Sequence, residues 1–201
     1  MRLFYSKTSP YARKVLVTAM EKGLAGEIEV VVTDPHVSDK VLAAVNPLHR
    51  VPALLLSDGT TLYDSPVICE WLDLQVATPR LVPKTGHGRW AVLKGQALAD
   101  GMMDDAVANV MEARRPEGRQ SLEQIARRTE TLLDCTKALE SELPGYPGAL
   151  SLAHIAAGCA LAYLDFRLPG LGWRSGSPTL SAWLEDFARR PSMQATRPDA
   201  D

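Results

Sequence analysis

The sequence predicts an α/β domain followed by an all-helical domain, and three observations support this prediction. Over residues 1–77, β-prone runs alternate with helical patterns in the order of a βαβ unit followed by a ββα unit. Residues 78–88 are rich in proline and glycine, which is typical of a linker. Over residues 89–201, every element that the periodicity indicates is helical. We therefore expect domains 1–77 and 89–201, joined by the linker 78–88.

The βαβ unit begins with a short β-prone run from Met1 to Tyr5. Ser9-Pro10 then provides an N-cap residue followed by proline at the first helical position. Apolar residues recur at helical spacing until Gly23, the expected stop; they are Ala12, Val15, Leu16, Ala19 and Met20. Ile28 to Val32 is a second β-prone run, so a right-handed crossover between parallel strands is expected. A short helix at about Asp39 to Val45 follows.

The ββα unit is expected to be a β-hairpin that leads directly into a helix. An apolar run from Ala53 to Leu56 and a β-prone run from Thr60 to Tyr63 flank the turn residues Ser57-Asp58-Gly59. Ser65-Pro66 then suits the N-cap and the first helical position. One face of the predicted helix is apolar, with Val67, Ile68, Trp71 and Leu72.

The second domain is expected to contain four main helices. The first runs from Arg89 to about Ala113, and serine N-caps mark the starts of the next three: Ser121, Ser151 and Ser177. Gln124, three residues after its serine, predicts a capping box. The helix that begins at Ser151 is apolar on nearly every face and is expected to be buried. The polar tail from Pro191 is expected to fray.

The composition disfavours several classes of function. With 46% apolar and 23% charged residues and a net charge of −2, no overall field favours nucleic acid or anionic lipid. The three cysteines are widely spaced, lack a Cys-x-x-Cys pair and are expected to be buried, unreactive thiols of a reducing compartment. The four histidines are too far apart for a metal motif. Without a signal-peptide pattern or a run long enough to span a membrane, a cytoplasmic protein is expected.

The junction between the hairpin and its helix is the first candidate ligand site. A helix N-terminus favours a carboxylate, and Asp64 beside it can take an ammonium group, so Asp64-Ser65 would suit the end of an α-amino acid. If the Val51-Pro52 bond is cis, Val51 can offer its N–H and C=O groups to an extended peptide. The alternative is that Asp64-Ser65 is an ordinary helix cap.

These segments, taken together in order, resemble the glutathione S-transferase family. The similar stretches are YSKTSPYARKV near the start, NPLHRVP and YDSP around the hairpin, and SLAHIAAGCALAYLDFR near the end. The resemblance extends over nearly the whole chain. It implies a thioredoxin-like glutathione-binding domain with an all-helical domain behind it. His154 stands where the family usually places an aspartate, in the capping box that Ser151 begins.

The resemblance implies that Ser9 serves the sulfur of glutathione. A free thiol with a pKa of about 8.5 is only slightly ionised at neutral pH, so the enzyme must lower that pKa. Ser9-Pro10-Tyr11-x-Arg13 is similar to the S-P-F-x-x-R of serine-type transferases such as the tau class, whereas the omega class has cysteine there. Serine therefore implies conjugation and argues against thiol exchange. Tyr5, Ser6 and Thr8 remain rival hydroxyls, and Ser9 alternatively only caps its helix.

The resemblance also assigns the remaining parts of the ligand site. Val51, before Pro52, would pair with the cysteinyl unit, and Asp64 and Ser65 would hold the γ-glutamyl end. Asp64 departs mildly from the family's more frequent glutamate. The glycyl carboxylate would meet one of two neighbouring side chains, Arg50 or His49. The predicted electrophile pocket contains Tyr11, Met102, Met103 and Ala106, with core packing as the alternative for the last three.

The resulting hypothesis is a detoxifying glutathione transferase that acts on a small hydrophobic electrophile, with glutathione as co-substrate and no metal. The alternative is a non-catalytic scaffold of the same fold, similar to transferase-like stress proteins that bind RNA polymerase. The intact Val51-Pro52 and Asp64-Ser65 pairs favour the enzyme, because a scaffold does not need a peptide site. The resemblance implies a homodimer, and no nucleic acid or membrane partner is expected.

Overall fold

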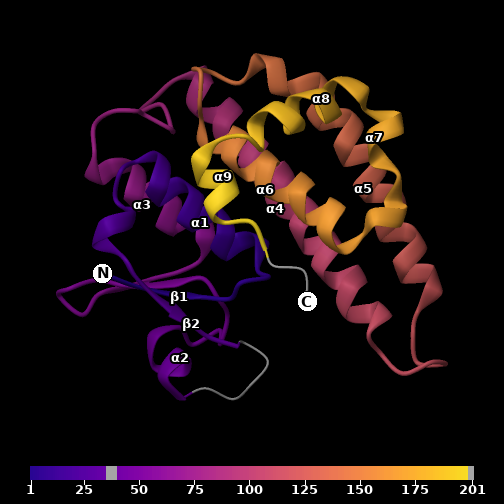
Figure 1. The fold of residues 1–201 in the computed structure, drawn as a ribbon, viewed down its shortest axis with the longest axis horizontal. Coiled ribbons are helices and arrows are strands. Elements are labelled where there is room, and N and C mark those ends of the chain that lie inside the picture. Colours follow the sequence, from indigo (N-terminus) through magenta and orange to yellow (C-terminus); the bar gives the residue numbers. More distant parts are fainter. Residues whose placement is uncertain (35–39, 199–201) are drawn as a thin grey trace. The chain divides into compact units, whose positions relative to one another are not determined.

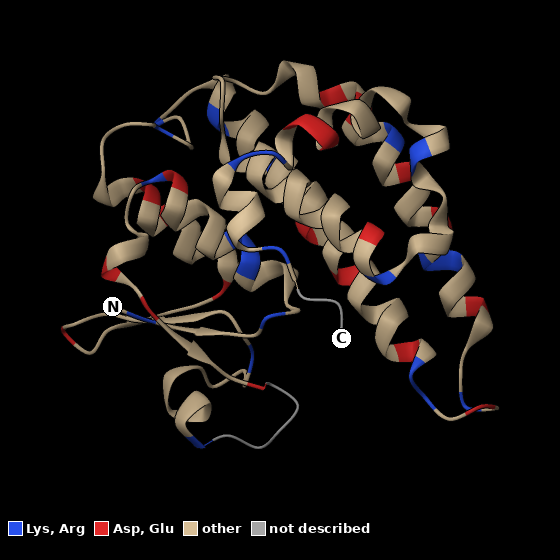
Figure 2. Ribbon diagram, in the orientation of Figure 1, with Lys and Arg blue, Asp and Glu red and all other residues tan. Residues whose placement is uncertain are grey.

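The chain folds into two compact units, which are described separately below (Figure 1). The computed structural model describes residues 1–34 and 40–198. The first unit contains Met1–Val82 and the described part of the C-terminal segment that begins at Pro191, and the second contains Pro83–Arg190. The predicted thioredoxin-like βαβ-ββα order and the all-helical second half are both confirmed. Acidic and basic residues are interleaved along the helices of both units (Figure 2).

The sheet of the first unit has the strand order β2-β1-β3-β4. Its strands are β1 (Arg2–Tyr5), β2 (Glu29–Val32), β3 (Ala53–Leu55) and β4 (Thr61–Leu62). β1 and β2 are parallel, with Leu3 opposite Val30, as the predicted crossover requires. β1 and β3 are antiparallel, with Leu3 opposite Leu54, and β3 and β4 form the predicted hairpin.

Helices lie on both faces of this sheet. α1 (Pro10–Glu21) packs against α3 (Ser65–Gln75), and Figure 1 shows the two side by side. α2 (Lys40–Val45) lies on the opposite face, where it forms an apolar cluster with β1 and β3. The predicted start of α2 at Asp39 lies outside the described residues.

α1 ends as its sequence predicts, at a glycine. Gly23 has a φ of +72°, which a residue with a side chain rarely adopts. Its N–H donates to the Met20 carbonyl at 3.0 Å, and the next N–H, of Leu24, donates to the Ala19 carbonyl at 2.8 Å. These bonds satisfy carbonyl groups that the helix end would otherwise leave unpaired.

The second unit is built around a buried central helix. Its helices are α4 (His87–Ala113), α5 (Leu122–Glu142), α6 (Leu152–Arg167), α7 (Trp173–Gly176) and α8 (Pro178–Phe187), with 3₁₀ turns at Leu143–Gly145 and Pro169–Leu171. α6 packs against both α4 and α8, and twelve of its residues are buried. The predicted burial of this helix is therefore confirmed.

The capping box predicted for Ser121 and Gln124 is half right. The Ser121 hydroxyl accepts from the Gln124 N–H at 3.3 Å. The reciprocal bond is not made by Gln124, because the Ser121 N–H donates to Glu112 Oε1 at 2.7 Å. A carboxylate at the end of α4 therefore completes the cap of α5.

The prediction that the tail frays from Pro191 is wrong. The segment forms α9 (Pro191–Ala195) and packs against α1, with Met193 only 2% exposed. Arg13 of α1 donates to the Met193 carbonyl at 3.0 Å and to Thr196 Oγ1 at 3.2 Å. The tail therefore belongs to the first unit, whereas the sequence had assigned it to the helical domain. Polar composition alone could not indicate this, because the partners are far apart in the sequence.

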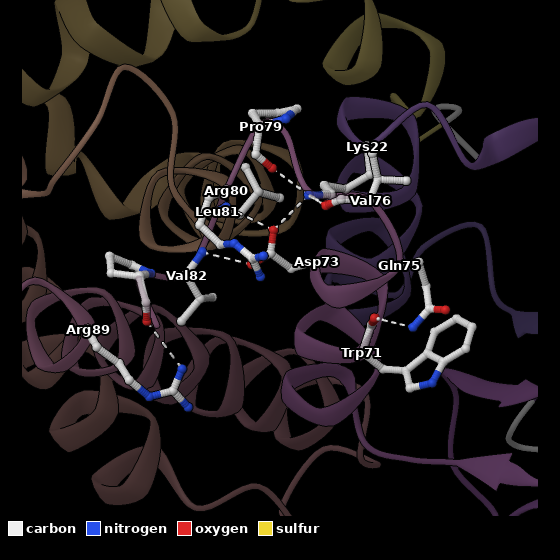
Figure 3. Close-up of polar contacts among 11 residues, drawn as sticks. Lys22, Trp71, Asp73, Gln75, Val76, Pro79, Arg80, Leu81, Val82 and Arg89 are labelled. Carbon is white, nitrogen blue, oxygen red and sulfur yellow. Dashed lines mark hydrogen bonds and ion pairs between the residues drawn. The ribbon is translucent and has the colours of Figure 1, made fainter. Parts of the chain in front are cut away.

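A buried ion pair joins the C-cap of α1 to α3, and both of its side chains bind the segment that follows α3 (Figure 3). Lys22 Nζ lies 2.9 Å from Asp73 Oδ1, with the two side chains 0% and 2% exposed. The ammonium also donates to the carbonyls of Val76 and Pro79. The Asp73 carboxylate accepts from the N–H groups of Leu81 at 2.8 Å and Val82 at 3.0 Å. The first part of the predicted linker 78–88 is therefore an ordered part of the first unit.

Candidate functional site

Ser9 lies at the N-cap of α1, at the end of the loop that follows β1. Its hydroxyl accepts from the Ala12 N–H at 3.2 Å, so the alternative that Ser9 caps its helix is observed. A hydroxyl has two acceptor lone pairs and one donor, and the cap uses only one lone pair. No other hydrogen bond of the Ser9 side chain occurs among the described residues, so its O–H remains available to donate.

The rival hydroxyls differ from Ser9 in placement. Tyr5 is buried in β1, whereas Ser6 and Thr8 are partly exposed in the loop. None of the three is at the N-terminus of a helix, where the partial positive charge favours an anion. Ser9 therefore combines a free donor with the helix end.

Val51 presents an unpaired main chain directly before β3. The Val51-Pro52 bond is cis, as peptide binding at this position requires. Neither the N–H nor the C=O of Val51 has a hydrogen-bond partner in the part of the chain that the structure describes. Its side chain packs in the apolar cluster beneath α2. Such a residue can accept an added extended strand.

Asp64 and Ser65 lie at the start of α3, which begins one residue earlier than predicted. The helix begins at Ser65 and Asp64 takes the N-cap position, although Ser65 was the expected cap. The Asp64 carboxylate is exposed and makes no capping bond. Ser65 is a buried residue, and among the described residues its hydroxyl also has no hydrogen-bond partner. An ordinary helix cap would use one of these groups, and this site uses neither.

Asn46 organises the loop before Val51, a role that the sequence did not predict. Its Nδ2 donates to the Arg50 carbonyl at 2.8 Å, and its Oδ1 accepts from the Leu48 N–H at 3.0 Å. These bonds hold a loop in which His49 has a φ of +54°. The side chains of Arg50 and His49 are exposed. The signal for this role was the Asn-Pro pair, which is typical of a turn.

The four residues predicted to line the electrophile pocket fall into two groups. Met102, Met103 and Ala106 are fully buried in α4, as expected for core packing. Tyr11 is in the first turn of α1, two residues after Ser9, and is partly exposed. Of the four, Tyr11 has the placement that suits a ligand contact best.

The cysteines have the surroundings of structural thiols. Cys69 and Cys159 are buried, and the Thr18 hydroxyl donates to Cys69 Sγ at 3.4 Å. Burial, together with the carboxylates of Asp105 and Asp134, raises the pKa of the Cys135 thiol. A raised pKa disfavours the reactive thiolate.

Neither a metal cluster nor a membrane-spanning helix occurs among the residues that the structure describes. No group of three or more histidine, cysteine, aspartate or glutamate side chains is arranged to hold an ion. No helix of residues 1–34 and 40–198 has both the length and the apolar character needed to cross a bilayer.

Both halves of the chain match protein-family models. Residues 8–75 match the glutathione S-transferase N-terminal domain, and residues 114–186 match the C-terminal domain of the same family. The chain belongs to the glutathione S-transferase family. The first match contains Ser9, Val51, Asp64 and Ser65.

Relatives in this family align with nearly the whole chain. The uncharacterized GST-like protein YibF of Escherichia coli K12 is 34% identical over 98% of both chains. A glutathione transferase family member from Pseudomonas fluorescens Pf-5, solved with bound S-(propanoic acid)-glutathione, is 38% identical. It has a TM-score of 0.90 over 99% of this chain and 100% of that one. A glutathione S-transferase from Methylobacillus flagellatus KT, solved with glutathione bound, is 38% identical, with a TM-score of 0.92 over 98% and 99% of the two chains.

Proposed function

We propose that this protein is a glutathione transferase that binds glutathione on its first unit and activates the thiol as a thiolate. The observation that carries the proposal is a set of polar groups in the first unit that have hydrogen-bonding capacity left for a ligand. In the described chain, no partner takes the Ser9 O–H, the Val51 main chain or the Ser65 hydroxyl, and the Asp64 carboxylate makes no capping bond. Solved relatives of 38% identity hold glutathione or its conjugate, which supports the choice of ligand.

Each group suits one part of glutathione. The Val51 N–H and C=O pair with the main chain of the cysteinyl unit, as in β-addition. The N-terminus of α3 and the Ser65 hydroxyl bind the γ-glutamyl carboxylate, while Asp64 binds the ammonium group. Arg50, or alternatively His49, meets the glycyl carboxylate. Both of these side chains are exposed and so can reach a ligand on the surface.

Ser9 is proposed to stabilise the thiolate once the proton has left. The S–H bond breaks and its proton passes to solvent. The sulfur then forms a bond to carbon of the electrophile, and a leaving group such as halide departs with its bonding electrons. Lowering the pKa by two units would need about 2.7 kcal/mol of preferential thiolate stabilisation. A hydroxyl donor together with the N-terminus of α1 can supply this amount.

The electrophile is proposed to be small, and Tyr11 is the residue we favour for contacting it. Met102, Met103 and Ala106 are retained as pocket residues only through the family resemblance, since their burial favours a core role. The conjugate in the Pseudomonas structure carries a propanoic acid on its sulfur. A halopropanoate therefore belongs in the substrate panel, beside neutral halides, epoxides, enals, peroxides and disulfides.

Titration calorimetry with glutathione tests the binding half of this proposal. Charge-assisted hydrogen bonds contribute about 1.5 to 3 kcal/mol each, so the combined Asp64→Ala and Ser65→Ala variant should bind at least about tenfold more weakly. Asp134→Ala, at an exposed side chain of α5, is the control and should bind as the wild type does. Unchanged affinity in the double variant would remove this site.

Turnover of the electrophile panel tests the catalytic half. If the protein binds glutathione but turns over none of these electrophiles, the alternative hypothesis, a non-catalytic scaffold of the transferase fold, would be favoured over the enzyme. Absence of glutathione binding would refute both the site and the reaction.

A further inference from the structure

Arg13 is a buried cation of α1 whose hydrogen-bond acceptors are neutral. Its side chain is only 7% exposed. Its Nη2 donates to the Met193 carbonyl at 3.0 Å and its Nε to Thr196 Oγ1 at 3.2 Å. Within residues 1–34 and 40–198, no ion pair joins Arg13 to a carboxylate. No carboxylate of the described residues therefore offsets the guanidinium charge by direct contact.

Arg13 lies one turn of α1 after Ser9, and its guanidinium contacts the C-terminal segment. The two residues are four apart in the sequence, and the Arg13 N–H donates to the Ser9 carbonyl at 3.0 Å. Residues at i and i+4 share one face of a helix, and long side chains lean toward the helix N-terminus. Ser9 is at that N-terminus, so the cation reinforces the helix dipole where a thiolate would lie.

The carboxylate of α1 and Asp73 of α3 have hydrogen-bond partners other than Arg13. Glu21, at the other end of α1, accepts from the Ser192 hydroxyl at 2.5 Å. Asp73 of α3 is paired with Lys22. The C-terminal segment thus provides Arg13 with neutral hydrogen-bond acceptors. Ser192 of the same segment donates a hydrogen bond to Glu21, the acidic residue of α1. This arrangement positions the cation without neutralising it.

We propose that Arg13 is a positioning residue that lowers the pKa of the sulfur bound at Ser9, and that residues 191–196 hold its charge in place. This inference rests on the proposed function. At an effective dielectric constant of about 20, a positive unit charge roughly 10 Å away from a thiolate lowers the pKa of the thiol by about one unit. A structural clamp would not require that shift.

Two substitutions at Thr196 test the effect of the Arg13 charge on the sulfur pKa without removing Arg13. Thr196→Asp places a carboxylate beside the guanidinium, and Thr196→Asn offers a neutral acceptor of matched size. The sulfur pKa is measured from the ultraviolet absorbance of the thiolate in the complex with glutathione, so no turnover is needed. We expect Thr196→Asp to raise that pKa by about one unit and Thr196→Asn to leave it within a few tenths.

Two substitutions of Arg13 provide an independent measurement if Thr196→Asp does not fold. Arg13→Gln should raise the sulfur pKa by about one unit, and Arg13→Lys should restore most of the shift. With an accepted electrophile, kcat/KM of Arg13→Gln should be about tenfold lower below the sulfur pKa and should approach the wild-type value at high pH.

The outcomes separate this inference from the proposed function. Folded Thr196→Asp or Arg13→Gln protein that binds glutathione with an unshifted sulfur pKa would overturn the role of Arg13 and leave the transferase intact. Wild-type protein that binds no glutathione would instead refute the proposed function, and the inference with it.

Discussion

The Ser9 hydroxyl caps α1, and under the proposed function it would also donate to the sulfur of glutathione. The cap uses an acceptor lone pair, and thiolate stabilisation uses the proton. Ser9→Ala removes both. We expect glutathione affinity at about pH 6 to change little, because the bound ligand is then mostly thiol. The loss of one donor to an anion should lower kcat/KM by roughly 10- to 1,000-fold and raise the kinetic pKa of the sulfur.

A pH–rate profile with one accepted electrophile measures both quantities. Ser9→Cys is the informative companion variant, because a cysteine at a helix N-terminus has a lowered pKa and becomes the nucleophile itself. The Ser9→Cys variant should lose conjugation activity and form a mixed disulfide with glutathione. If Ser9→Ala keeps the rate and the sulfur pKa, Ser9 is only a cap, and Tyr5, Ser6 or Thr8 must serve the sulfur.

Gly95 allows α4 to pack closely within the helical unit. A Cβ built at Gly95 would lie 2.5 Å from Tyr146 Cζ and 2.9 Å from Ala153 Cβ, closer than real contacts. The Tyr146 ring can move only within a buried cluster with His154, and the Ala153 methyl group is fixed to α6. We expect Gly95→Ala to destabilise the protein by about 1 to 3 kcal/mol, through overpacking.

Gly101 supplies the matched control on the same helix. A Cβ there would meet nothing within 4 Å, and the residue is exposed. Gly101→Ala should therefore stabilise the protein by about 0.5 to 1 kcal/mol, the difference in helix propensity. The melting temperatures of the two variants, compared with that of the wild type, test these expectations. Equal melting temperatures would contradict the packing account.

The N-terminus of α6 depends on a neutral histidine. His154 Nδ1 accepts from the Ser151 N–H at 3.1 Å and lies 2.8 Å from the Ser151 hydroxyl, so the predicted capping role is confirmed. Burial, and next the positive charge of Arg190, lower the pKa of His154. The other neighbours are the rings of Tyr146 and Trp183. Protonation would convert the acceptor into a donor and place a second cation beside Arg190.

The direction of this shift fixes how His154 contributes to stability with pH. Because the folded pKa is below the unfolded value of about 6.5, its contribution is fully present above that pH and is lost as pH falls through the folded pKa. His154→Asp should remove this acid sensitivity and stabilise the protein at neutral pH by about 0.5 to 2 kcal/mol, since a carboxylate caps without opposing the dipole. Melting curves from about pH 5 to 8 test both effects. A lower melting temperature at pH 7 would contradict the capping account.

Asp73 connects α3 to the end of α1 and to the segment before α4 through buried polar contacts. Asp73→Ala would leave the buried Lys22 ammonium without its counter-ion and the N–H groups of Leu81 and Val82 without acceptors. We expect a loss of about 3 to 5 kcal/mol of unfolding free energy. Asp134→Ala, which breaks an exposed 3.1 Å pair with Lys137, should cost less than about 1 kcal/mol. Similar denaturation midpoints for the two variants would exclude this role.

The sequence predicted those features whose signals are local. Gly23 at the end of α1, the capping hydroxyls of Ser9 and Ser121 and the hairpin between β3 and β4 depend on neighbouring residues, and the structure has these in place. Ser177 stands at the N-cap of α8 as predicted, but its hydroxyl makes no capping bond. The family resemblance placed Ser9, Val51, Asp64 and Ser65 on one unit, and their roles remain predictions. The contacts that were missed join distant residues: Arg13 to Met193, Lys22 to Asp73, and Ser121 to Glu112. Composition and periodicity contain no information about such partners.

Exposed apolar side chains on α3 favour the homodimer that the family resemblance implies. Val67 and Leu74 are 48% and 61% exposed and lie seven residues apart, so they share one face of α3. Large apolar residues that share one exposed face are typical of a protein interface. We therefore predict that these two side chains of α3 are buried between subunits.

Sedimentation at micromolar concentration should give a mass of about twice the 21.9 kDa of the chain. The combined Val67→Glu and Leu74→Glu variant should weaken the dimer at least about 30-fold, because burying unpaired carboxylates costs about 2 kcal/mol or more. Leu122→Glu, at the 72% exposed start of α5, is the control and should remain dimeric. A wild-type monomer would exclude the interface. A double variant that turns over electrophiles as a monomer would show that each chain holds a complete active site, because no residue of a second copy could then contribute to the reaction.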